Sequence, residues 1–422
     1  MILCINYRNG KPDRQVTYDL FSPAFKADPF PTFARMREAD PVYAHAAPDG
    51  RTIWYITRYD DVAAVLKDDQ RFCKDPRNAQ DTVGRAAGKA GFHSRPYQLI
   101  NENMLFSDPP DHTRLRALVS QAVTPRRVAS MSGQIQETAE RLIDQMERED
   151  HHDLIAAYAL PLAVIVISDL LGIPPVDREN VADWSQAIIS PGSRGLNYSA
   201  RKRKVRLFTD YLRDLFARRQ ADPRDDLITA LVQAETDGAR LSEAELFSMV
   251  ALLLVTGHET TVNLIGNGAL ALMAAPAQRE RLQADDRLWP AAVEELLRFD
   301  GPVETSTSRW VRADTTFGGH AMRRGDLARA VITSANRDPA HFARPDELDA
   351  GRVDNRHLAF GLGAHYCLGA PLARLEGSIA LETLFHRLPQ ARPALPLEEL
   401  PWRSGVLFRG LRRLPVTTRE SR

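Results

Sequence analysis

Apolar and polar residues follow a helical spacing along most of the chain. Apolar side chains recur at i, i+3 and i+4, which places them on one face of an α-helix, over residues 112–122, 130–148, 153–171, 178–190 and 200–220. Residues 41–57 instead predict a strand hairpin, because two apolar runs flank a turn at Asp49-Gly50. The pattern becomes helical again after Asp60.

The longest predicted helix spans residues 243–274. Ser242 and Glu245 form an S-x-x-E capping box at its start, and Pro276 marks its end. The helix is apolar on most sides from residue 249 to 255, so we expect it to be central and buried.

The C-terminal third is more irregular. A helix begins near Pro290, polar glycine-rich pieces with several possible strands occupy residues 301–366, and residues 367–387 are helical. Strands and helices do not alternate, so a doubly wound sheet is excluded. The predicted fold class is mainly α with a minor β region.

Composition narrows the function classes. The 422 residues are 44% hydrophobic, and 55 basic residues balance 55 acidic ones. A net charge of zero gives no reason to expect a nucleic acid or an anionic membrane as partner. We find no apolar segment long enough to cross a membrane, and we expect a cytoplasmic protein.

Cys367 is the most informative of three cysteines, the others being Cys4 and Cys73. No C-x-x-C motif occurs, and three cysteines are not a disulfide framework. Cys367 lies in a loop whose glycines, Gly361 and Gly363, permit turns closed to other residues. Such a loop can bring amide groups close to a sulfur and tune a metal–thiolate bond. From these residues alone, a buried structural cysteine remains the simpler interpretation.

A polar segment interrupts the long helix at residues 257–261. A threonine hydroxyl there can bond back to its own helix and bend it, and the neighbouring Glu259 could supply protons. His258-Glu259 does not start a zinc H-E-x-x-H site, because residue 262 is Val. An ordinary polar turn is the alternative.

Two further pairs have helical spacing. Glu295 and Arg298 are three residues apart, and His112 and Arg116 are four apart, so each pair shares one helix face. Taken alone, they fit a surface ion pair and a solvated basic face.

Residues 360–369, Phe-Gly-Leu-Gly-Ala-His-Tyr-Cys-Leu-Gly, match the haem-binding loop of the cytochrome P450 family at every fixed position. Residues 256–261 resemble the oxygen-activation motif of that family, with Thr256 where a small residue is usual. The resemblance extends over roughly residues 20–415, and the matching motifs occur in the same order as in the family.

The resemblance implies a cytochrome P450 fold in one domain over residues 1–422, with a β-containing part near 40–60, a helical core near 110–300 and the ligand loop at 360–369. A haem b would lie between the long helix and the helix after Cys367, with Cys367 as the iron ligand. Thr260 and Glu259 would handle protons, and Arg352 would join the Glu295–Arg298 pair. Residues implied to hold the haem are His112, Arg116, Gly257, Arg309, Phe360, Gly361, His365, Gly369 and Ala373.

The implied activity is oxidation of an apolar, medium-sized organic substrate with dioxygen. The chain has no dinucleotide, flavin or iron–sulfur motif, so we expect electrons from a separate ferredoxin or flavodoxin with its reductase. We expect a monomer that docks this donor through Arg114, Arg126, Arg127 and Arg374. Substrate contacts are expected from residues 76–100, 185–200, 252–256, 302–306 and 406–407.

Four alternatives stay open. The same haem could serve a peroxide-driven peroxygenase, an oxidative coupling enzyme or a non-catalytic gas sensor. A purely structural protein would bind no haem. The pair Glu259–Thr260 argues against a sensor, which needs no proton relay.

Overall fold

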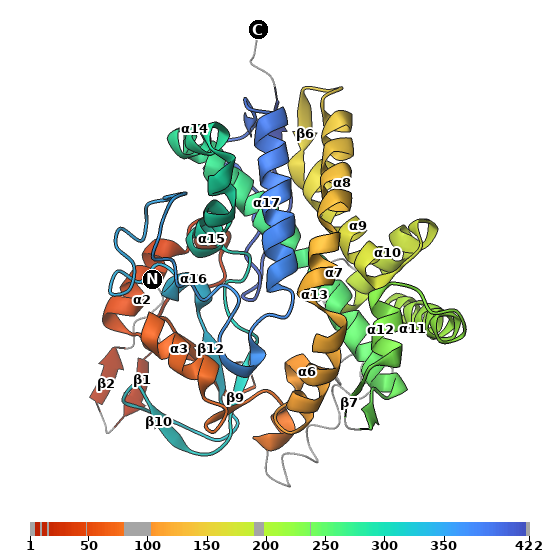
Figure 1. Ribbon diagram of the computed structural model, residues 1–422. Helices are drawn as coiled ribbons and strands as arrows, with labels where there is room; N and C mark the ends of the chain where they lie inside the picture. The colour runs from red at the N-terminus through yellow and green to blue at the C-terminus, as the bar shows by residue number, and fades with distance from the viewer. Residues whose placement is uncertain are drawn as a thin grey trace.

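The computed structural model describes residues 5–8, 11–14, 17–47, 49–79, 103–189, 198–236 and 238–418. Helices dominate it (Figure 1), which confirms the predicted mainly helical fold class. The α-helices are α1 Pro23–Ala27, α2 Phe30–Ala39, α3 Tyr59–Lys67, α6 Asp111–Ala122, α7 Pro125–Ser130, α8 Ser132–Met146, α9 Leu160–Leu171, α10 Arg178–Ile189, α11 Tyr198–Ala221, α12 Leu227–Gln233, α13 Glu243–Ala274, α14 Pro276–Ala284, α15 Trp289–Asp300, α16 Ile332–Ala335 and α17 Ala370–Arg387.

The strands are short and form small sheets. The largest sheet has the order β3-β4-β12-β9-β5, with β12 parallel to β4 and the other pairs antiparallel. Their bounds are β1 Ile5–Arg8, β2 Lys11–Arg14, β3 Val42–Ala46, β4 Thr52–Ile56, β5 Phe72–Cys73, β6 His151–Asp153, β7 Glu235–Thr236, β8 Ala239–Arg240, β9 Arg309–Val311, β10 Thr315–Phe317, β11 His320–Met322, β12 Leu327–Ala330, β13 Arg392–Pro393 and β14 Pro415–Thr417.

The predicted hairpin is confirmed as β3 and β4. Gly50 in its turn has φ +83°, a left-handed conformation that favours glycine. Further along this sheet, β5 pairs with β9, two strands that are far apart in the sequence. This pairing brings the segment just after β5 next to Arg309, the first residue of β9.

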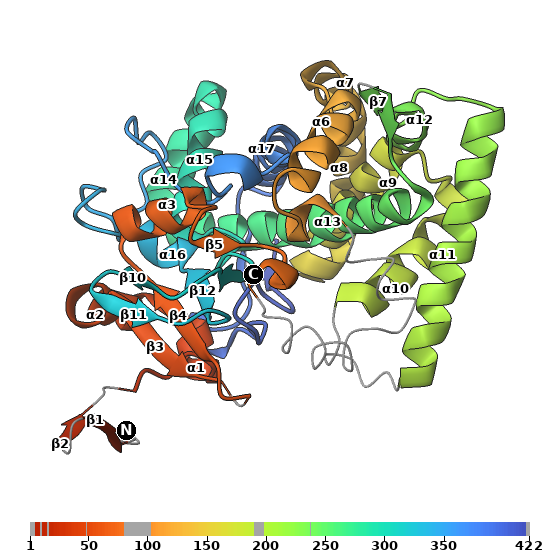
Figure 2. The same ribbon diagram turned by 90° about the horizontal axis from the view of Figure 1, so that it is seen from below.

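The long helix α13 crosses the middle of the molecule (Figure 2). The predicted capping box is confirmed: Ser242 Oγ accepts from the Glu245 amide at 3.3 Å, and Glu245 Oε2 accepts from the Ser242 amide at 2.8 Å. The prediction that no segment is long and apolar enough to cross a membrane was wrong for α13, which alone among the described helices has that length and composition, but 67% of its most apolar window is buried inside the protein. The prediction of a central core helix is therefore confirmed.

Two glycines let neighbouring helices approach α13 closely. A Cβ on Gly257 would lie 2.7 Å from Ile167 Cδ1 of α9, and one on Gly377 of α17 would lie 2.9 Å from Leu264 Cδ2 of α13. Neither distance is compatible with normal packing of a larger side chain. Gly257 was predicted to contact the cofactor, and the packing of α9 gives a second reason for glycine there.

Some predicted boundaries were wrong. The helix predicted over 153–171 begins instead as strand β6, continues as a π-helix over Ile155–Ala159 and only then becomes α9. The strand forms because β6 pairs with β14 near the C-terminus, a contact that local spacing does not encode. The helix predicted over 130–148 is divided between α7 and α8 at Met131.

The predicted Glu295–Arg298 pair is a buried junction. Both side chains are fully buried, and Arg298 binds Glu295 in a bidentate manner at 2.7 and 2.8 Å. Arg352 adds a bond of 3.0 Å to the same carboxylate, as predicted. Arg298 also donates to the carbonyls of Asn336 and Pro345 at 3.0 and 2.7 Å, so the junction ties α15 to the long irregular segment before Cys367.

We expect Glu295→Ala to destabilise the protein by about 3–5 kcal/mol, because it leaves the buried Arg298 without its counter-charge. Glu347→Ala is the matched control: it removes the exposed Arg344–Glu347 pair, 2.9 Å apart, and should cost under about 1 kcal/mol. Chemical denaturation measures both. Equal effects of the two variants would contradict the structural role of the junction.

Candidate cofactor pocket and active site

An apolar cavity of about 290 Å³ lies between α13 and the loop that carries Cys367. The loop and the start of α17 supply one wall, and helix α13 supplies the opposite wall through Leu252, Leu253, Thr256, Gly257, Thr260, Thr261 and Leu264. A cavity with apolar walls and a few convergent polar groups is the usual form of a cofactor site. Of the twelve predicted site residues, eleven line this cavity, namely His112, Arg116, Gly257, Thr260, Arg309, Phe360, Gly361, His365, Cys367, Gly369 and Ala373.

The loop holds Cys367 by its backbone. The Cys367 amide donates to the Phe360 carbonyl at 2.9 Å, and Gly361 and Gly363 have φ of +71° and +76°. The side chain of Cys367 is accessible from the cavity, although protein atoms surround it closely on the other sides. This burial raises the pKa of the thiol, while amide hydrogen bonds from Gly369 and Ala370 and the charges of Arg116 and Arg374 act in the opposite direction. As predicted, loop amides point at the sulfur, where they would stabilise a thiolate.

Cationic and imidazole side chains gather at one edge of the cavity. His112 and Arg116 come from α6, Arg309 comes from β9, and His365 comes from the ligand loop. The rings of His112 and His365 lie 4.2 Å apart. Burial lowers the pKa of Arg309 to about 10, so this side chain stays charged at neutral pH.

The edge has unsatisfied hydrogen-bonding capacity. His112 Nε2 is buried and has no hydrogen-bond partner among the described residues. Burial, then the charge of Lys74, lower the pKa of His365 to about 2. No carboxylate among the described residues pairs with Arg116 or Arg309, and Arg309 donates only to the Leu66 carbonyl at 3.3 Å. Buried cations and donors need an anion. The two carboxylates of a haem fit this edge, as its apolar ring fits the walls.

The threonine hydroxyl groups of the polar turn of α13 donate to carbonyls one helical turn earlier. Thr260 Oγ1 donates to the Thr256 carbonyl at 2.7 Å, and Thr256 Oγ1 donates to the Leu252 carbonyl at 2.7 Å. Both threonines line the cavity on the side opposite Cys367. Each hydroxyl oxygen still has lone pairs that can accept a hydrogen bond from a group in the cavity.

Glu259 is the one predicted site residue that does not line the cavity. Its buried carboxylate forms an ion pair with Arg403 of the C-terminal region. Arg403 is held in turn by its Nε, which donates to the Leu411 carbonyl at 3.3 Å. No local pattern indicated Arg403, because the pair joins residues far apart in the chain.

The structure tests three of the five stretches predicted to contact the substrate. Leu252, Leu253 and Thr256 line the cavity, and so do Pro302, Val303 and Ser306. Residues 406–407 are not among the lining residues of this cavity, and their contact with the substrate stays a prediction: the Val406 carbonyl accepts from Thr305 Oγ1 at 2.7 Å. Most of 76–100 and part of 185–200 lie outside the described residues.

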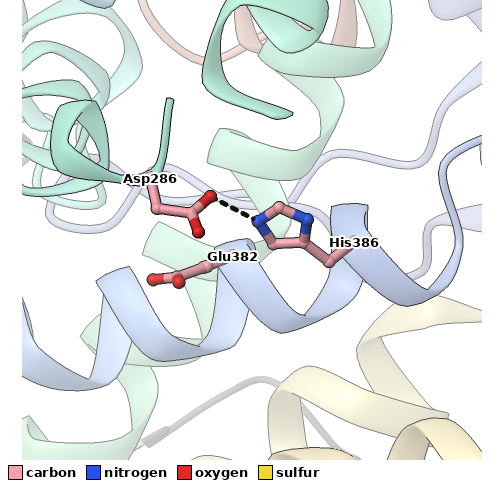
Figure 3. A group of neighbouring side chains, drawn as sticks. All are labelled: Asp286, Glu382 and His386. Atoms are coloured by element: carbon pink, nitrogen blue, oxygen red, sulfur yellow. Dashed lines mark hydrogen bonds and ion pairs between the residues drawn. The ribbon is translucent and has the colours of Figure 1, made fainter. Parts of the chain in front are cut away.

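Asp286, Glu382 and His386 form the group of potential metal ligands found among the described residues (Figure 3). His386 Nε2 is 2.9 Å from Asp286 Oδ1, and both side chains are exposed. Glu382 and His386 lie on α17 at least two helical turns beyond Ala373. This group is a surface hydrogen-bonded pair with a second carboxylate beside it, separate from the cavity.

Comparisons with known proteins agree with this geometry. The family profile for Cytochrome P450 matches residues 194–391. Polyketide biosynthesis cytochrome P450 PksS of Bacillus subtilis (strain 168) is 44% identical over 398 residues, which are 93% of this chain and 96% of the relative. Cytochrome P450 monooxygenase PikC of Streptomyces venezuelae is 40% identical, covering 94% of this chain and 93% of the relative.

A solved structure is similar over nearly the whole chain. Myxobacterial cytochrome P450 CYP267B1, in complex with myristic acid, has a TM-score of 0.87 at 41% identity and covers 95% of this chain and 99% of its own. The chain therefore belongs to the cytochrome P450 family. It is a haem b monooxygenase that oxidises an apolar organic substrate with dioxygen and electrons from a redox partner.

We expect iodoacetamide to alkylate Cys367 but not Cys73 in protein prepared without haem. Cys367 is open to the cavity, whereas Cys73 is buried and out of reach of the reagent. Burial raises the pKa of both thiols, to about 12 for Cys73, but amide hydrogen bonds and the charges of Arg116 and Arg374 oppose the rise at Cys367, and the thiolate is the reactive form. Added haem should protect Cys367, as measured by peptide mass spectrometry. Unchanged labelling of Cys367 after haem binding would contradict this site.

Proposed function

We propose that Cys367 is the iron ligand and that His112, Arg116, Arg309 and His365 bind the haem carboxylates. One observation carries this assignment. Among the described residues, Cys367 has the one thiol that faces the cavity, and it lies opposite Thr260, while cations without carboxylate partners lie along a single edge. Bound haem supplies the dioxygen chemistry, and a thiolate ligand favours O–O cleavage by donating electron density. The remaining tasks belong to the protein.

Proton delivery is assigned to Thr260 and Glu259. The Thr260 hydroxyl faces the cavity and can pass a proton onward after accepting one. The Glu259 carboxylate lies on the neighbouring position of α13, paired with Arg403. Arg403 orients this carboxylate, so protons would enter from the side of the C-terminal region.

The substrate is a neutral apolar molecule of medium size. Leu252, Leu253, Val303 and Ile167 supply apolar contact area, and the described lining contains no Asp or Glu. A cationic substrate would lose its hydration there without gaining a counter-charge. One relative, PksS, is named for polyketide biosynthesis. We therefore propose a polyketide-derived intermediate without an amino group as the substrate.

The electron donor is a ferredoxin or flavodoxin, which binds on the Cys367 side of a cytoplasmic, monomeric protein whose single domain comprises the whole chain. Three of the four arginines suggested for docking already form ion pairs: Arg114 with Glu245, Arg127 with Asp225, and Arg374 with Glu294. Arg126 is exposed, and no carboxylate of the described residues pairs with it. We therefore assign Arg126 the largest share of the attraction to an acidic donor.

We expect Thr260→Ala to lower the fraction of electrons recovered in product by at least an order of magnitude while haem stays bound. A positioned proton donor contributes roughly 10²–10⁴ in rate, and its loss diverts electrons to peroxide. Product, electron consumption and peroxide are measured with the neutral compound that produces the largest spin-state shift.

Ser248→Ala is the matched control for this variant. It removes a buried hydroxyl without a partner from the same helix, outside the cavity lining, and should leave the coupling unchanged. Unchanged coupling in Thr260→Ala would contradict the proposed proton role.

A further inference from the structure

Lys74 is a buried cation at the edge of the cavity that the sequence pattern did not indicate. It lines the cavity with only 3% of its surface exposed. Its ammonium donates to the carbonyls of Thr307 and Ser308 at 3.2 and 3.3 Å and to the Thr307 hydroxyl. All three acceptors are neutral, and no carboxylate in the described part of the chain forms an ion pair with Lys74 Nζ.

The surrounding backbone fixes Lys74 in this position. Asp108 accepts hydrogen bonds from the amides of Lys74 and Asp75 at 2.8 and 3.1 Å. The pairing of β5 with β9 places Lys74 beside the segment from Thr307 to Arg309. Asp108 thus binds the main chain of Lys74, while the ammonium is left to face the cavity edge.

The electrostatics of this edge indicate a missing anion. Burial lowers the pKa of Lys74 far below its ordinary value and Arg309 lowers it further, although the nearby charge of Asp108 acts in the opposite direction. Lys74 lines the same cavity as His365, Arg309 and Arg116. Lys74 therefore lies within the group of side chains assigned to the haem carboxylates, and a buried ammonium there is costly unless an anion compensates it.

We propose that Lys74 binds a carboxylate at this edge, and that the carboxylate is a haem propionate shared with Arg309. This inference rests on the proposed haem site. A substrate carboxylate offers the same chemistry, but the location of Lys74 beside His365 and Arg309 favours the haem. Lys74 thereby adds a charge-assisted hydrogen bond to cofactor retention.

The test measures haem loss from the ferric protein to excess apomyoglobin, without substrate or turnover. Lys74→Met should lose haem roughly tenfold to a hundredfold faster, the value of one hydrogen bond to a charged group. Lys74→Gln should lose haem equally fast, although its amide can still donate to Thr307 and Ser308. This variant replaces Lys74→Met in the test if the methionine variant folds poorly. Lys74→Arg, which keeps the charge, should restore most of the retention. The exposed Lys67 on α3 provides the control Lys67→Met, which should match the parent protein.

Haem dimethyl ester, which lacks carboxylate charge, separates the possible causes. With the ester, the parent protein and Lys74→Gln should lose the cofactor at equal rates, because the interaction being removed is absent in both. Persistence of the difference with the ester would overturn the proposal in favour of a packing role. Normal haem retention in Lys74→Gln combined with weaker binding of myristate would also overturn it, in favour of a substrate carboxylate. Failure of the haem site itself is distinguishable, because the parent protein would then lack thiolate-ligated haem.

Discussion

The structure depends on holding one sulfur atom at a fixed place opposite α13. A continuous series of buried hydrogen bonds leads to that atom. Glu295 binds Arg298, Arg298 binds the Asn336 carbonyl, and the Asn336 side chain accepts from the Leu358 amide at 2.7 Å. Two residues later, the Phe360 carbonyl accepts from the Cys367 amide. These paired groups connect the Glu295–Arg298 junction to the loop that carries Cys367, which is the kind of support that a preorganised active site requires.

The distribution of charge is the second constraint. The chain has no net charge, yet Lys74, Arg116 and Arg309 lie along one edge of an apolar cavity without carboxylate partners among the described residues. A haem fits both the apolar walls and the cationic edge, since its ring is apolar and its two carboxylates are anionic. The same reasoning explains why the acidic Glu259 is kept out of the cavity by Arg403: a free carboxylate among the apolar walls would be poorly solvated.

Sequence reasoning succeeded where the information is local or carried by the family resemblance. The capping box of α13, the hairpin at Gly50 and the pair Glu295–Arg298 follow from spacings of a few residues, and the ordered motifs brought Cys367, His112 and Thr260 together. It failed where function depends on distant segments. Lys74 reaches the cavity only because β5 pairs with β9, Arg403 meets Glu259 across much of the chain, and β6 replaces a predicted helix start by pairing with β14. The spacing of apolar residues within one segment does not indicate which distant segment it pairs with.

The central claim is that Cys367 binds the haem iron as a thiolate. The carbon monoxide difference spectrum of the reduced protein tests it most directly, because a thiolate ligand strongly red-shifts the Soret band. We expect the shifted band in the parent protein and its loss in Cys367→Ser, with haem still present. Absence of the shifted band from freshly prepared parent protein, or its persistence in Cys367→Ser, would contradict the claim.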